Sequence, residues 1–157
     1  MAGEMDGKYV VRGSQAECYV TINGNRYNFA QAISLEATMD ISKSSATAIG
    51  KTGKFNFGTT WEGSGTMTLH YNQSIMREIM YQFKELGTEV YFTIEVTNKS
   101  NDGIIGEQTI MLNNCSINGG TLTKFDSDSD YLDEDVEFTF DDWEMPKKFN
   151  QLPFMSA

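Results

Sequence analysis

The residues of this chain that could do chemistry are mostly carboxylates, and they gather near its C-terminal end. Ten of the 22 acids lie between Asp126 and Glu144, a segment that contains no Lys or Arg. The remaining residues hold twelve acids and twelve bases, so the formal net charge of −10 belongs to this segment. Like charges held side by side repel, so such a cluster must face water, a cation or a basic partner.

The first candidate partner of these carboxylates is a calcium ion. Asp126, Asp128, Asp130 and Glu137 occupy the first, third, fifth and twelfth positions of an EF-hand loop. The sixth position requires glycine for its sharp turn, but it is Tyr131, and strand patterns rather than helices flank the segment. We therefore expect a solvated charge cluster with no dedicated metal site.

Two other motifs could point to catalysis or nucleotide binding. Gly50-Lys51-Thr52 is similar to the end of a phosphate-binding loop, but Ser45 stands where the first glycine belongs and no helix follows. The single histidine, His70, has no Cys or Asp close by in the sequence to form a zinc site or a nucleophile–base pair. The acidic balance also argues against a nucleic-acid binder. We therefore expect no enzyme and no cofactor.

The acidic segment also has the alternation of a strand. One face of an extended chain would hold Val136, Phe138 and Phe140, and the other Asp135, Glu137, Thr139 and Asp141. We expect an apolar face in the core and an anionic face outside it. What meets the anionic face becomes the functional question.

The rest of the chain is dominated by period-two patterns, which predict a mainly β protein. An Asn23-Gly24 hairpin joins the first two strands. The predicted strands are 17–22, 26–29, 33–41, 66–71, 90–96 and 108–112. In 33–41 the alternating apolar residues should form a core face, and they are Ile33, Leu35, Ala37, Met39 and Ile41. One helix is predicted at 74–86, with Asn72 or Ser74 capping its start, Gly87 at its end and an apolar stripe that includes Phe83 and Leu86.

Residues 43–61 interrupt the alternation and predict a long loop. The segment carries Lys43, Lys51 and Lys54 with no acid between Asp40 and Glu62. It also carries three aromatic side chains, Phe55, Phe57 and Trp61. Loops of this length inside compact domains are usually functional or disordered, and exposed aromatics on a basic loop suggest a contact surface. We interpret it as an assembly loop.

The length predicts a single domain over residues 1–157, with a flexible N-terminal arm at 1–16 and a C-terminal tail at 146–157. No apolar run resembles a signal peptide or a membrane span, so we expect a soluble protein made in the cytosol.

Five segments in this order resemble a tail tube protein of contractile phages and phage-tail-like bacteriocins, of the PBSX-prophage type. They are Gly50–Gly53, Trp61–Thr68, the Ser74–Met80 helix, Tyr91–Ile94 and Glu134–Asp142. The resemblance covers about Ala16 to Met145. It implies an antiparallel β-sandwich or barrel-like fold with one flanking helix, assembled as hexameric rings that stack into a hollow tube.

The resemblance further implies a sheath, a tape-measure protein and a baseplate as partners, with DNA passing through the lumen unbound. We expect Glu137 and Asp141 to face the lumen, and the loop that holds Asp126, Asp128, Asp130 and Asp133 to face outward or toward the next ring. A tube protein of type VI secretion, or a monomeric β-barrel that binds a ligand or cation, remains an alternative.

Overall fold

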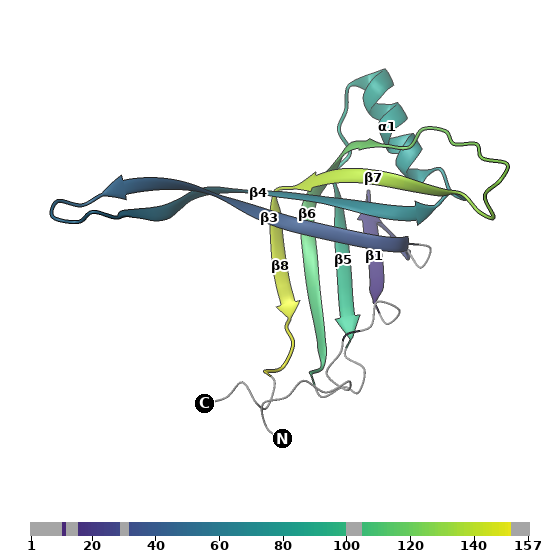
Figure 1. The fold of residues 1–157 in the computed structure, drawn as a ribbon. Helices are drawn as coiled ribbons and strands as arrows, with labels where there is room; N and C mark the ends of the chain where they lie inside the picture. The colour runs from purple at the N-terminus through teal and green to yellow at the C-terminus, as the bar shows by residue number, and fades with distance from the viewer. Residues whose placement is uncertain (1–10, 12–15, 29–31, 100–104, 152–157) are drawn as a thin grey trace. The chain divides into compact units, whose positions relative to one another are not determined.

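The computed structural model describes residues 11, 16–28, 32–99 and 105–151. Within them the chain forms eight strands and one helix (Figure 1). The elements are β1 (Glu17–Ile22), β2 (Asn25–Asn28), β3 (Ala32–Thr47), β4 (Lys54–His70), α1 (Ile75–Leu86), β5 (Phe92–Lys99), β6 (Glu107–Gly120), β7 (Asp133–Phe140) and β8 (Asp142–Lys147). The predicted class, mainly antiparallel β with one helix, is confirmed.

Residues of the chain group into two compact units. The first comprises Met1–Ala32, Val90–Cys115 and Asp142–Ala157, and the second comprises Ile33–Glu89 and Ser116–Asp141. Strand β6 runs through both, since its first part pairs with β5 and β8 and its last residues pair with β7. That the whole chain behaves as one domain stays a prediction.

The first unit orders its strands β2-β1-β5-β6, with β8 on the other side of β6. The β1–β2 hairpin turns at Asn23 and Gly24, whose φ values of 52° and 82° confirm the predicted turn. Val20, Ile94 and Leu112 are buried in its core. Pro146, expected in the tail, belongs to β8 and lies where the β6–β8 register shifts, an irregularity that tolerates its missing N–H.

The second unit is built around the antiparallel pair β4–β7. Gly63 to His70 of β4 lie opposite Phe140 to Asp133 of β7. The predicted alternation of β7 is confirmed, because Val136, Phe138 and Phe140 are buried while Asp135 and Glu137 are exposed. Met76 and Ile79 of α1 are also buried.

The predicted loop 43–61 is wrong as local structure. Residues 43–47 end β3, residues 54–61 begin β4, and only 48–53 form a turn, with Gly50 at a φ of 85°. The sequence does not reveal this hairpin. Apolar and polar residues alternate along a strand only where one of its faces is buried, and neither face is buried here. The two strands satisfy each other's backbone groups, so no core pattern is required.

Strand β3 differs from its prediction in a related way. Its alternating apolar side chains were expected to form a core face, yet no described side chain of β3 is buried. Ile33, Met39 and Ile41 are all exposed. Exposed apolar side chains that follow one another along a strand are typical of interaction surfaces.

Helix α1 begins and ends close to its predicted bounds. Gly87 is a left-handed C-cap whose N–H bonds to the Phe83 carbonyl, as expected. Ser74 stands at the N-cap position, as predicted, but its side chain makes no capping bond; Gln73 Oε1 accepts the Ile75 N–H at 2.7 Å instead. Phe83 and Leu86 were expected in the core, but both side chains are exposed. The buried residues of α1 lie in its first turns, and the last turns leave their side chains exposed.

The two chain ends are only partly described. The predicted arm 1–16 lies outside the described residues except for positions 11 and 16. Of the predicted tail, residues 146 and 147 end β8, and 152–157 lie outside the described residues.

Candidate functional site

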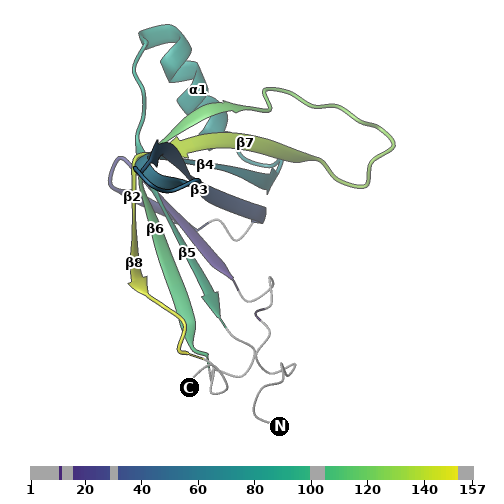
Figure 2. The same cartoon turned by 60° about the vertical axis from the view of Figure 1, so that its left-hand side comes forward.

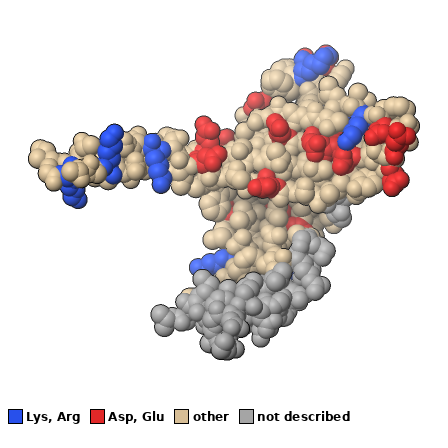
Figure 3. All heavy atoms as spheres, in the orientation of Figure 1, with Lys and Arg blue, Asp and Glu red and all other residues tan. Residues whose placement is uncertain are grey.

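The outer part of the β3–β4 hairpin carries the predicted basic and aromatic residues. We call residues 43–57 the hairpin tip. Only Gly63 to His70 of β4 pair with β7, so the earlier residues of β4 have β3 as their neighbour. Lys43, Lys51, Lys54, Phe55 and Phe57 are all exposed there. Figure 3 shows the basic side chains spaced along this projection. The structure therefore brings together five of the six predicted contact residues.

The hairpin exposes apolar side chains on both of its faces. Thr59 Oγ1 donates to the Ser42 carbonyl at 3.0 Å, which ties the strands together. Ile41 Cγ2 lies 3.2 Å from the position of a Cβ on Gly58, so Ile41 and Gly58 share a face. Phe57, next to Gly58, points to the opposite face. Ile41 is 52% exposed and Phe57 is 47% exposed, so neither face has a cover within the described chain.

Trp61, the sixth predicted contact residue, has a different environment. Its ring centroid lies 6.3 Å from that of Phe140, at an interplanar angle of 45°. Because Phe140 is a core residue of β7, Trp61 packs partly onto the fold, and 38% of it remains exposed. Trp61 therefore differs from Phe55 and Phe57 in packing against a core residue of the fold.

The outer face of β7 and β4 combines carboxylates with hydroxyl groups. Asp135 and Glu137 lie opposite Thr68 and Thr66. Thr68 Oγ1 donates to Asp135 Oδ1 at 2.8 Å. The Glu137 side chain is exposed. Asp141 is exposed between β7 and β8. The face is anionic and hydrophilic, as the alternation predicted.

A second acidic surface precedes β7. We call residues 121–132 the acidic loop; it joins β6 to β7 and reaches beyond the C-terminal end of β4 in both views (Figures 1 and 2). Asp126 accepts the Ser129 hydroxyl at 2.7 Å and the Asp128 N–H at 3.1 Å, and these bonds lower its pKa. Lys124 Nζ lies 2.8 Å from Asp133 Oδ1 and lowers the pKa of that carboxyl, mainly through this bond.

One carboxylate of the segment serves the fold instead. Glu134 is buried, on the same side of β7 as Val136. It pairs with Arg77 of α1 and accepts a 2.7 Å bond from Gln73 Nε2. Arg77 also donates to the Gln73 carbonyl and stacks over the Tyr71 ring, 4.4 Å from its centroid. The sequence contained a signal for the burial of Glu134, since it alternates in step with the apolar residues Val136, Phe138 and Phe140.

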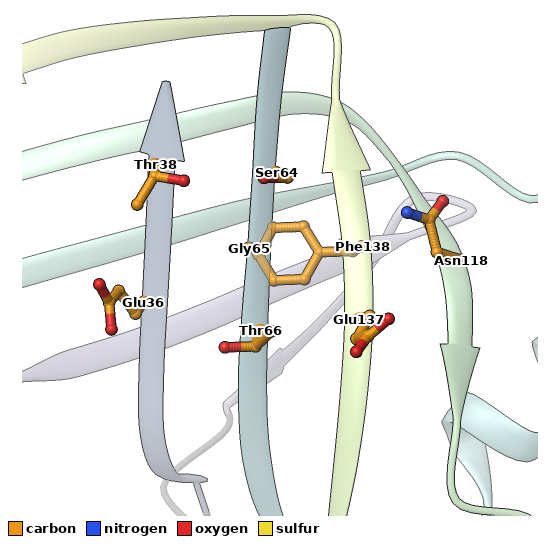
Figure 4. Close-up of a pocket in the computed structure, with 8 residues that line it drawn as sticks. All are labelled: Glu36, Thr38, Ser64, Gly65, Thr66, Asn118, Glu137 and Phe138. Carbon is orange, nitrogen blue, oxygen red and sulfur yellow. The ribbon is translucent and has the colours of Figure 1, made fainter. Parts of the chain in front are cut away.

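A shallow polar hollow lies on the second unit. Its volume is about 370 Å³, and Figure 4 shows Glu36 on β3 and Glu137 on β7 with β4 between them. Carboxylates two strands apart are separated by roughly 10 Å, which is too far to bind one cation. Within the described residues, no three His, Cys, Asp or Glu side chains are arranged to hold a metal.

The comparison with known proteins decides which family these surfaces belong to. A sequence profile described as "Phage tail tube protein" matches residues 3–147. The chain belongs to the phage tail tube protein family. The tail tube protein is 26% identical over 115 residues to the phage-like element PBSX protein XkdM of Bacillus subtilis (strain 168), covering 73% of this chain and 78% of that one. The uncharacterized protein YqbM of the same strain is 26% identical over 113 residues, covering 72% of this chain and 77% of that one.

Solved structures similar to the tail tube protein share its fold. The tube of an extracellular contractile injection system, in a PVC sheath-tube complex in the extended state, has a TM-score of 0.66 at 13% identity, over 88% of this chain and 92% of that one. The SPP1 tail tube has a TM-score of 0.63 at 8% identity, over 94% and 87%. Tail tube proteins are structural, which agrees with the expectation of a non-enzyme. Among the described residues, no helix of the tail tube protein could cross a membrane.

Proposed function

We propose that this tail tube protein forms hexameric rings, and that the rings stack into the hollow inner tube of a contractile phage tail or a phage-tail-like bacteriocin. The observation that carries the proposal is the β3–β4 hairpin, which exposes apolar side chains on both of its faces. Exposed apolar side chains on a single chain are typical of interaction sites, and here neighbouring copies of the chain would bury them.

The position of β3 at the end of the described strand order supports the same proposal. Strand β3 stands at the end of the strand order and is 16 residues long. It contains no proline and only three charged residues, so little on it discourages a further strand from pairing. A closed ring of copies would remove this edge, because each copy would lie against the next.

The anionic face of β7 has a role in such a tube. With Glu137 and Asp141 turned to the lumen, the wall repels the phosphates of passing DNA, whereas a basic wall would bind them. The same face has hydroxyl neighbours in Thr66 and Thr68, which favours a hydrated, non-adhesive surface.

The partners of the tube follow from its place in the particle. They are other copies of this chain, a sheath around the tube, a baseplate at its end, and a tape-measure protein or DNA within the lumen. Support comes from the similar structures, which include a sheath-tube complex and a baseplate of contractile systems. The protein is made in the bacterial cytoplasm and assembled there into a virion tail or a bacteriocin particle.

Electron microscopy of the purified protein tests the proposal directly. We expect tubes or six-fold rings in negative stain, and a mass well above 17.6 kDa by light scattering. A sharp monomer at all concentrations, without rings or tubes, would instead favour the monomeric ligand-binding alternative.

A further inference from the structure

The hairpin tip and the acidic loop occupy opposite ends of β4. The tip adjoins Lys54, where β4 begins, and the acidic loop is held at His70, where β4 ends. At that end the Tyr71 N–H donates to the Leu132 carbonyl at 3.0 Å, and the rings of His70 and Tyr131 meet edge to face, 5.6 Å apart. The thirteen strand residues 58–70 separate the two surfaces by roughly 40 Å, so they cannot contact each other within one copy.

The hairpin tip presents positive charge with apolar area. Lys43, Lys51 and Lys54 form no ion pair with any described residue. Ile49 is exposed in the turn, and Phe55 and Phe57 are exposed on the face opposite Lys43 and Lys54. An uncovered group of this composition suits a partner that offers carboxylates around apolar side chains.

The acidic loop has that composition. Asp126, Asp128 and Asp130 form no ion pair within the described part of the chain, whereas Asp133 is already paired with Lys124. Leu122, Phe125 and Tyr131 are exposed among them, Phe125 by 90%. The hydrogen bonds from Ser129 and Asp128 hold the pKa of Asp126 low, so its carboxylate stays ionised. Figure 3 shows acidic side chains at this end and basic side chains at the other.

We propose that the hairpin tip of one copy docks on the acidic loop of a second copy, with the three lysines against Asp126, Asp128 and Asp130 and with Phe55 or Phe57 against Phe125 and Tyr131. The contact joins two different surfaces, so it repeats from copy to copy and builds rings or filaments. This inference rests on the proposed function and names both sides of one contact within the assembly.

A charge exchange between the two surfaces tests this pairing. The tip variant is K43E/K51E/K54E, the loop variant is D126K/D128K/D130K, and the exchanged variant carries all six changes. Each triple variant should fold but require at least a tenfold higher concentration to assemble, because like charges then face each other. The exchanged variant keeps the net charge of −10, so it controls for total charge, and it should form tubes.

An equimolar mixture of the two triple variants should also assemble, since each basic surface then finds an acidic one on the other variant. Normal tubes from either triple variant alone, or no tubes from both the exchanged variant and the mixture, would overturn the pairing. If the wild-type protein forms tubes in the same experiment, such results contradict only the proposed pairing. If the wild-type protein forms no tubes, the result contradicts the proposed function.

A crosslinking measurement covers the case in which a triple variant does not fold. A photoreactive phenylalanine analogue replaces Phe55 in otherwise wild-type protein, and crosslinked peptides are identified by mass spectrometry. We expect intermolecular crosslinks to residues 121–133. Intermolecular crosslinks that fall only elsewhere would contradict the proposal.

Discussion

Arg77 of α1 and Glu134 of β7 form an ion pair in which the Glu134 side chain is 1% exposed. Gln73 joins the pair from the helix start, where its two amide atoms bond Glu134 and the first helical N–H. The group therefore couples the start of α1 to β7 and holds the helix on the sheet.

Removing one partner of this pair should destabilise the fold strongly. Arg77→Met leaves a buried carboxylate without its counter-charge, which costs about 3–5 kcal/mol in such sites. Urea unfolding followed by circular dichroism measures the change. Glu17→Gln, which removes the exposed pair with Lys99, is the control and should have no measurable effect. Equal stability of Arg77→Met and wild type would show that the pair does not hold the helix.

Two glycines of β4 leave room for aromatic rings of β7. A Cβ on Gly65 would lie under 3.0 Å from both the Phe138 ring and the Glu36 carbonyl, and one on Gly63 would clash with the Phe140 ring. Gly65→Ala should therefore destabilise the protein by about 1–3 kcal/mol, because it overpacks the core. Gly53→Ala, with no atom within 4 Å, is the matched control. Thermal unfolding of the two variants should separate them clearly.

The anionic face should be dispensable for folding. Glu137→Gln with Asp141→Asn relieves repulsion on one face, so the folded subunit should gain a few tenths of a kcal/mol. Chemical denaturation measures the gain, and tube formation should persist. Unfolding of the double variant would mean that these carboxylates have essential partners, and the proposed lumen role would then be wrong.

Calcium should have little effect on stability. The spacing of Asp126, Asp128, Asp130 and Glu137 imitates a calcium loop, but Glu137 belongs to β7 and Tyr131 occupies the turn position. Millimolar calcium should shift the melting temperature by less than about 2 °C, since only a bound ion stabilises the native state. Magnesium at the same concentration controls for ionic strength. A rise of many degrees with calcium alone would reveal a metal site.

The hairpin tip should serve assembly rather than folding. Replacing residues 46–57 with a short Gly-Ser linker removes the tip but keeps the strands on either side paired, and loop-closure free energy depends only weakly on length. The variant should show wild-type circular dichroism and form no tubes. Gly53→Ala, inside the tip, should assemble normally. Tubes from the linker variant would contradict the role of the tip.

Features of the fold could be predicted from the sequence where they depend on residues close together in the chain. The alternation of β7, the Asn23-Gly24 hairpin and the Gly87 helix end were all predicted correctly, because each depends on local pattern or local backbone preference. The order of five segments likewise indicated the family. Such features can be recognised from residues that are neighbours along the chain.

The remaining features were decided by tertiary contacts. Residues 43–61 predicted a loop because no face of that hairpin is buried within its own chain, so nothing selects for alternation. Phe83, Leu86 and Ile41 predicted core positions, and only the packing of α1 and β3 shows that these side chains stay exposed. The parity of Glu134 matched that of the buried residues of β7, but its counter-charge, Arg77 on α1, is set by the tertiary structure. The sequence by itself determined the helix, the Asn23-Gly24 hairpin, the alternation of β7 and the sign of each charge cluster. The tertiary structure decided which side chains the chain covers itself and which it leaves for another molecule, because burial depends on residues far apart in sequence.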